Sequence, residues 1–346
     1  MAFVGSQLQP LIFAAILPLV AADLNAADDL IWFFCAQSIA IAVAAVFSGP
    51  LADLFGRKYV TISGLLLSMI GMILAAATPN ATGFIAGQAF SGIGIAVQEL
   101  MAVTVITEMV PTNKRGFYVA ILVCVFIPFA PASLYGALIA RVSWRYCGCA
   151  IAIWNLGTAV VVCIFYSPPT RINSKDLTTF QKVKRIDVVG GSLLAAGLVI
   201  LLVGINTGGQ MYAWSSGRVV ALLTVGLACF AAMALHEFRF ARNPMFPRRL
   251  VRHPRPFFAL LVVIFMAGIN YIPLLFFWVL ECVAIYDSTT TEVGIRTLPF
   301  GFCILAGALF SAALVFMCKS YVRLIMTTFC IIQVVGTSSQ NLSWSA

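Results

Sequence analysis

The sequence has 346 residues, of which 62% are hydrophobic and 10% are charged. Soluble domains carry roughly 25% charged residues, so this composition excludes a soluble enzyme or a soluble binding module. The formal net charge of +9 does not indicate nucleic acid as a partner, because the basic residues lie in short breaks between apolar stretches.

Apolar stretches of about 20 residues recur along the chain, which is the length that a helix needs to cross roughly 30 Å of hydrocarbon. The sequence therefore predicts an all-α, polytopic transmembrane helical bundle embedded in the lipid bilayer, and charged residues taken as boundaries give about eleven spans. The first six are predicted at 2–22, 30–51, 59–80, 83–107, 117–140 and 146–167. The others are predicted at 188–206, 219–236, 256–280, 297–318 and 321–337.

Polar segments divide these spans into groups. We expect an N-terminal six-helix bundle at 1–167, a cytoplasmic loop at 168–187 and two linker spans at 188–236. A basic cytoplasmic loop follows at 237–255, and an incomplete C-terminal bundle of about three spans occupies 256–346. With the N-terminus inside, 17 of the 21 basic residues fall on the cytoplasmic side, as the positive-inside rule predicts. The remaining four are Arg141, Arg145, Arg218 and Arg296.

The segment between the second and third spans reads Gly49-Pro-Leu-Ala-Asp53-Leu-Phe-Gly56-Arg57-Lys58. It resembles the loop signature of the major facilitator superfamily. We expect Gly49 to allow close helix approach, Gly56 to allow a tight turn and Asp53 to form a charge pair or a helix-end contact with Arg57 or with neighbouring spans. Such a contact can be broken and remade during gating. Alternatively, these residues only cap helices and set the topology.

The fourth span carries an unusual set of polar side chains. Glu99 is the one carboxylate well inside a predicted span, and a buried carboxylate in a membrane is a functional candidate by default. We expect it to couple transport to protons; the alternative is that it lines a wet crevice or bonds to amides of a neighbouring helix. The candidates for a substrate cavity are Gln37, Gln88, Gln98, Asn155, Asn270 and Tyr271, although each alone is more often a packing residue.

Two prolines and a glycine interrupt the fifth span. Pro128 and Pro131 remove backbone donors and free carbonyls, and Gly136 lies one to two turns further on. The pattern predicts a gate helix that rearranges, with a static kink as the alternative.

Other functional classes have little support. His236 and His253 lie at predicted cytoplasmic edges without an acidic cluster beside them, and no nucleophile with a base at catalytic spacing is visible. We therefore expect no enzyme, no metal site and no cofactor.

Further runs make the resemblance more specific. These are Glu108-Met-Val-Pro111-Thr-Asn-Lys-Arg115, Trp144-Arg145-Tyr146 and Tyr212-Ala-Trp214-Ser-Ser. They are similar to the fungal fourteen-span drug:proton antiporters, and most to trichothecene efflux pumps. The resemblance implies proton-driven export of a toxin, drug or other small amphipathic compound across the plasma membrane or the vacuolar membrane. Related siderophore-iron transporters import instead, so the direction stays open.

Two features depart from that family. Gln88 occupies the position where many drug antiporters carry an arginine on the fourth span. The predicted spans also number three fewer than fourteen, which implies a chain truncated at its C-terminus. The leading hypothesis is a secondary transporter whose spans 1, 2, 4 and 5 line the cavity; a truncated membrane protein that does not transport is the alternative.

Overall fold

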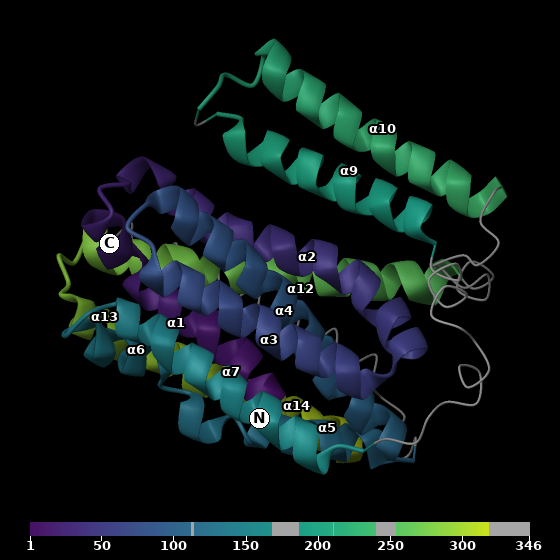
Figure 1. Cartoon of the computed structure of the whole chain (residues 1–346), viewed down its shortest axis with the longest axis horizontal. Helices are drawn as coiled ribbons and strands as arrows, with labels where there is room; N and C mark the ends of the chain where they lie inside the picture. The colour runs from purple at the N-terminus through teal and green to yellow at the C-terminus, as the bar shows by residue number, and fades with distance from the viewer. Residues whose placement is uncertain (112–113, 168–186, 210, 240–253, 318–346) are drawn as a thin grey trace. The chain divides into compact units, whose positions relative to one another are not determined.

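The computed structural model describes residues 1–111, 114–167, 187–209, 211–239 and 254–317 (Figure 1). Helices make up nearly all of this part, and it contains no β-strand. Eight helical segments within it, counting the interrupted fifth span as one, are long and apolar enough to cross a membrane. The all-α transmembrane prediction is therefore confirmed.

The observed helices begin and end within a few residues of the predicted spans. The first four are α1 (Ala2–Asp23), α2 (Leu30–Phe55), α3 (Arg57–Ala77) and α4 (Ala81–Met109). Later ones are α7 (Arg145–Phe165), α9 (Val188–Thr207), α10 (Gly217–Arg239), α12 (Pro254–Ala284) and α14 (Leu298–Met317). The predicted loops at 168–187 and 237–255 lie almost entirely outside the described residues, and the predicted span at 321–337 lies wholly outside them.

The chain forms two compact units. The first contains Met1–Ser6, Asp28–Ala102 and Gly148–Arg252, and the second contains Gln7–Ala27, Val103–Cys147 and His253–Ala346. Each unit is thus assembled from separate segments of the chain, whereas the predicted domains are continuous segments. The domain boundaries predicted from sequence stay a prediction.

In the first unit, α3 and α4 pack along a seam of small residues. A Cβ added at Gly64 would lie 2.6 Å from Val97 Cβ, and one at Gly87 would lie 2.8 Å from Gly71 O. In a lipid environment helices gain no hydrophobic driving force for association, so close backbone packing through small residues has to hold them together. This seam fixes which faces of α4 are left for α2 and α7.

The same unit contains the predicted linker spans. Helices α9 and α10 lie side by side as an antiparallel hairpin (Figure 1). At their connection, Gly209 adopts a φ of +79° and packs against the Trp214 ring. Tyr212 and Trp214, from the run that carried the family resemblance, therefore build the turn of this hairpin.

The second unit contains α12, α13 (Thr290–Arg296), α14 and the fifth span. It also contains the part of α1 that follows Ser6. The fifth span is not one helix. It consists of α5 (Arg115–Cys124), a short 3₁₀ helix, η3 (Ile127–Phe129), and α6 (Ala132–Ala140). The interruption lies where the two prolines predicted it.

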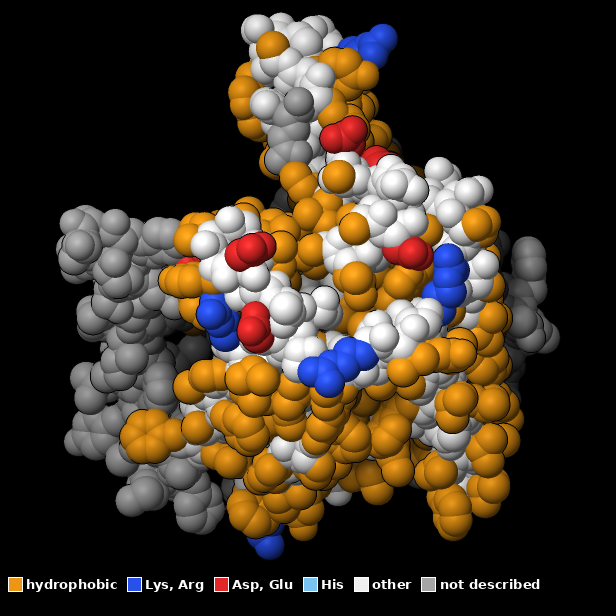
Figure 2. Space-filling view, turned by 90° about the vertical axis from the view of Figure 1, so that its left-hand side faces the viewer, with side chains coloured by type: hydrophobic (Ala, Val, Ile, Leu, Met, Phe, Trp, Pro, Cys, Tyr) orange, Lys and Arg blue, Asp and Glu red, His pale blue; other side chains and the backbone are white. Residues whose placement is uncertain are grey.

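Large hydrophobic side chains cover much of the described surface. Figure 2 shows hydrophobic side chains over much of the face in view, with few charged side chains among them. Among the exposed residues, Ile153 on α7 is 70% exposed and Leu227 on α10 is 59% exposed. Such a surface is suited to lipid tails rather than water.

Candidate functional site

The signature segment forms a helix junction rather than an open loop. Helix α2 continues through Gly49 and Asp53 to Phe55, and α3 begins at Arg57. The single residue between them, Gly56, has φ +92° and ψ 142°, a conformation that essentially only glycine adopts at low cost. The prediction of a tight turn at Gly56 is confirmed.

Two charged residues at this junction contact other groups. Arg57 Nη2 lies 3.9 Å from Asp53 Oδ1, and the Arg57 side chain is only 10% exposed. Lys58 Nζ donates a hydrogen bond to the carbonyl of Cys163 over 2.8 Å, which links the start of α3 to the end of α7. The expected Asp53–Arg57 pair is thus present, while its opening during gating stays a prediction.

Within the described residues, no helix packs closely against Gly49 in the way that the sequence predicted. A Cβ added at Gly49 would meet no described atom within 4 Å. The close helix approach in this part of the chain occurs instead at Gly92 on α4, where an added Cβ would lie 2.9 Å from Ala40 Cβ on α2.

A buried group of amide side chains lies where α4 and α7 meet the first residues of the chain. Gln98 and Asn155 are both 0% exposed. A Cβ added at Gly5 would lie 3.1 Å from Gln98 Oε1 and 3.0 Å from Asn155 Oδ1. Asn155 Nδ2 donates to Ser68 Oγ on α3 over 3.0 Å. We call Gln98, Asn155 and Ser68 the buried polar cluster.

Several atoms of the buried polar cluster have no hydrogen-bond partner among the described residues. They are both amide atoms of Gln98 and the Oδ1 of Asn155. A buried polar atom left without a partner costs about 1–3 kcal/mol, and the cost is higher in a membrane, where the surroundings offer no water. These atoms therefore keep hydrogen-bonding capacity that water or a polar ligand would satisfy.

A second pair of buried amides lies on the α2 side of α4. Gln37 on α2 is 4% exposed and Gln88 on α4 is 1% exposed. Gln37 Nε2 and Gln88 Oε1 have no hydrogen-bond partner in the described part of the chain. One turn towards the N-terminus, the rings of Phe33 and Phe84 pack with centroids 4.8 Å apart, so the two glutamines lie at similar heights on neighbouring helices.

Glu99 is partly buried on α4. It is eleven residues after Gln88, which places both on one face of the helix, about 16 Å apart along the axis. Gln98 lies about 100° round the helix, on the face towards α3 and α7. The predicted cavity residues of the first unit thus separate into two groups, on neighbouring faces of α4. Asn270 and Tyr271 lie on α12, and their side chains are outside the described residues.

The interruption in the fifth span is held by specific contacts within the second unit. Tyr135 OH donates to the carbonyl of Pro128 over 3.0 Å. Gly136 permits α6 to approach α1, because a Cβ added there would lie 2.9 Å from Ile12 Cγ2. Gly301 on α14 packs directly against the Ala130 carbonyl between η3 and α6. The prolines thus produce a break with partners on two neighbouring helices.

Sequence reasoning missed two polar clasps that join helix ends. Trp144 Nε1 donates to Asp23 Oδ2 over 2.8 Å, and Arg145 lies 3.8 Å from the same oxygen. His236 at the end of α10 lies 3.0 Å from Asp187, which also caps α9 through the Gly190 N–H. The Trp144-Arg145 run was visible as a motif, but nothing in the sequence indicated Asp23 or Asp187 as the partner.

An all-α chain with this many apolar helices of spanning length, with buried amides within them, defines a polytopic α-helical membrane protein. The chain belongs to the Major Facilitator Superfamily, because the model of that family matches residues 1–339. It is therefore an integral, multi-pass membrane protein of a transporter family and not an enzyme.

Named relatives are fungal transporters. The chain is 30% identical to the MFS-type transporter phomT of Diaporthe leptostromiformis, over 83% of this chain and 49% of phomT. It is 28% identical to the rubrofusarin-specific efflux pump aurT of Gibberella zeae, over 88% of this chain and 56% of aurT. It is 26% identical to the aspyridones efflux protein of Neocamarosporium betae, over 83% of this chain and 51% of that protein. The chain spans about half the length of these relatives.

Proposed function

We propose that the protein is a secondary active transporter that exports a small amphipathic organic compound in exchange for protons. The observation that carries the proposal is the set of buried amides on α2, α4 and α7, each of which has at least one polar atom without a partner in the described part of the chain. Stability alone favours apolar side chains at such positions, so these amides support a role in binding. The relatives named as efflux pumps support export of a secondary metabolite or toxin.

The face of α4 that carries Gln88 and Glu99 is the proposed site of substrate contact and proton exchange. Gln37 lies on α2 at about the height of Gln88. Gly92 lets the backbones of α2 and α4 approach closely there. Neutral amides donate and accept hydrogen bonds at once, which suits an uncharged polar group on an otherwise apolar substrate. A carboxylate on the same face can take up and release a proton as its surroundings alternate between wet and dry.

Replacing Glu99 with glutamine tests the proton-coupling role. Glu99→Gln keeps the size and hydrogen-bonding capacity of the side chain but cannot exchange a proton. We expect pH-gradient-driven export into energised vesicles to fall at least tenfold, while exchange of labelled for unlabelled substrate without a gradient persists.

Glu108→Gln is the matched control, because Glu108 is an exposed carboxylate near the end of the same helix. Its export should equal that of the wild type. Gradient-driven export by Glu99→Gln at the wild-type rate would remove Glu99 from the mechanism and leave the amide sites to be judged separately.

The protein is further proposed to act in the plasma membrane, where export removes a toxic product from the cell. A fluorescent fusion expressed in yeast should outline the cell surface. Fluorescence confined to the vacuolar membrane would instead indicate sequestration inside the cell.

A further inference from the structure

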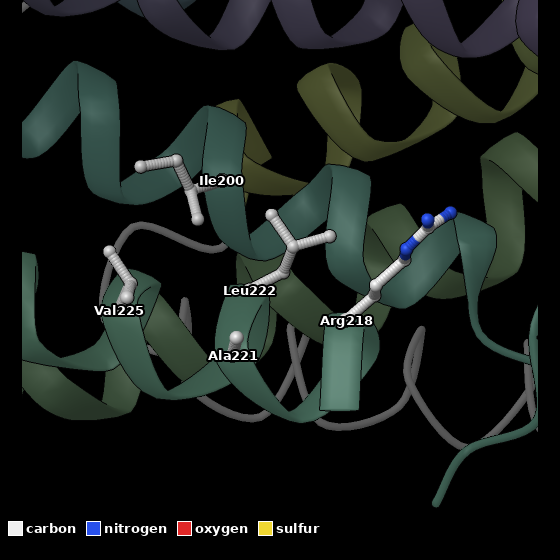
Figure 3. A pocket seen from close by; sticks show the side chains of 5 residues that line it. All are labelled: Ile200, Arg218, Ala221, Leu222 and Val225. Atoms are coloured by element: carbon white, nitrogen blue, oxygen red, sulfur yellow. The ribbon is translucent and has the colours of Figure 1, made fainter. Parts of the chain in front are cut away.

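The linker hairpin carries a groove that the transport proposal does not use. It has a volume of about 420 Å³ and is lined by Ile200 of α9 together with Arg218, Ala221, Leu222 and Val225 of α10. Figure 3 shows the four apolar side chains between the two helices and the Arg218 guanidinium extending away from them at one end. We call this the hairpin groove.

The lining and the position of the hairpin groove restrict what can fill it. Ala221 and Val225 are exposed and lie in a predicted span, so an apolar chain rather than water is the suitable occupant. From Arg218 to Val225 the groove follows α10 for about 10 Å. That length accommodates part of one extended acyl chain.

The cation at the end of the groove supplies the selectivity that an apolar lining lacks. Lipid tails are as apolar as the groove, so apolar contact alone gives no preference for one lipid over another. Arg218 Nη1 donates to Tyr212 OH over 2.9 Å, and its guanidinium lies over the Tyr212 ring at 5.1 Å from the centroid. An arginine has five N–H donors. In the described part of the chain only one of those of Arg218 is used, which leaves donors directed outward for a phosphate.

We propose that the hairpin groove binds one phospholipid, with an acyl chain along Ile200 and Ala221 and the phosphate on Arg218. The Arg218–Tyr212 contact holds the guanidinium at the height of the first turn of α10. Under the topology predicted from the basic residues, this height is the lipid headgroup region on the non-cytoplasmic side of the membrane, where phosphate groups lie. The bound lipid would cover a hairpin that exposes most of its apolar surface.

The test is native mass spectrometry of the purified, delipidated full chain titrated with dioleoyl phosphatidylglycerol. The wild type should retain one tightly bound lipid. Arg218→Gln should weaken this binding about tenfold, the effect of losing a charge-assisted bond to phosphate. Ala221→Phe should abolish it by filling the groove. Dioleoylglycerol, which has the same acyl chains without a phosphate, should bind the wild type no better than phosphatidylglycerol binds Arg218→Gln.

Three control variants separate lipid binding from damage to the fold. Arg141→Gln removes another outward arginine that donates one 2.9 Å hydrogen bond to a hydroxyl, that of Thr291. Ala231→Phe adds a ring at an exposed position of α10 that does not line the groove. Tyr212→Phe removes the hydroxyl that helps to hold the Arg218 guanidinium but keeps the ring and the charge, so it should weaken binding less than Arg218→Gln does. The first two variants should retain the lipid at wild-type affinity.

Several outcomes would overturn the proposal. One is wild-type affinity of Ala221→Phe for the lipid, and another is binding of diacylglycerol to the wild type as tight as that of the phospholipid. Complete displacement of the lipid by inorganic phosphate alone would leave the acyl chain without a role. A dimer of the chain that Ala221→Phe separates would identify a second copy as the occupant instead.

Discussion

Gly56 lies between two spanning helices with a backbone conformation that other residues adopt only with strain. Its φ of +92° and ψ of 142° make any side chain costly by about 1–3 kcal/mol, even though a Cβ there would meet no described atom within 4 Å. We expect Gly56→Ala to lower the melting temperature of the purified protein. Gly49→Ala should leave it unchanged or slightly higher, because Gly49 lies in helical backbone with open space around it. Equal effects of the two substitutions would contradict this assignment.

Gln98 offers a test of whether the buried amides serve function or stability. Gln98→Met keeps the side-chain length and removes two polar atoms that have no hydrogen-bond partner in the described part of the chain. Removing such atoms should leave the free energy of unfolding unchanged or raise it by about 1 kcal/mol, while export falls. Unfolding in detergent and export in cells measure the two effects. A loss of stability without any loss of export would show that the amide is structural.

At the scale of single elements, the α3–α4 seam controls the position of the polar residues. A Cβ at Gly71 would collide with the backbone of Ser91 and Gly87. Gly71→Val should therefore push the helices apart and cost about 1–3 kcal/mol. Gly157→Val on α7 is the matched control, since a Cβ there meets no described atom within 4 Å. Thermal unfolding should separate the two variants, and similar melting temperatures would show that the seam is not required.

The sequence predicted where the helices begin and end but not which helices pack together. Helix ends followed from hydropathy and charge, and the break in the fifth span followed from Pro128 and Pro131, because a missing N–H acts locally. Helical spacing places Gln98 and Glu99 about 100° apart on α4, but nothing in the sequence indicated that α3 and α7 pack on the face of Gln98. The His236–Asp187 clasp joins residues 49 positions apart, and only the pairing of α9 with α10 brings them together.

At the scale of the whole molecule, the proposed transport requires helices that pack together and can still move. Small-residue seams and helix-end clasps within each unit hold neighbouring helices, and the break at η3 interrupts the fifth span. Alternating access requires two bundles that rock around a site near the middle of the membrane. The relatives are about twice as long as the aligned part, so the complete transport cycle is proposed for a protein of that extent.

The central claim is export, and the most direct test is efflux from a transporter-deficient yeast that expresses the chain. Two further proteins should be measured in parallel. One is the chain extended to the fourteen spans of the fungal drug:proton antiporters, and the other is the Gln98→Met variant. Cells are loaded with labelled fungal polyketide toxins, azole-type drugs or iron-loaded siderophores, and the retained label is followed over time. We expect cells with the extended version to lose a toxin or drug faster than empty cells do. Cells with the Gln98→Met variant should lose it more slowly than cells with the unsubstituted chain. Accumulation of siderophore, or retention equal to that of empty cells for every compound, would contradict it.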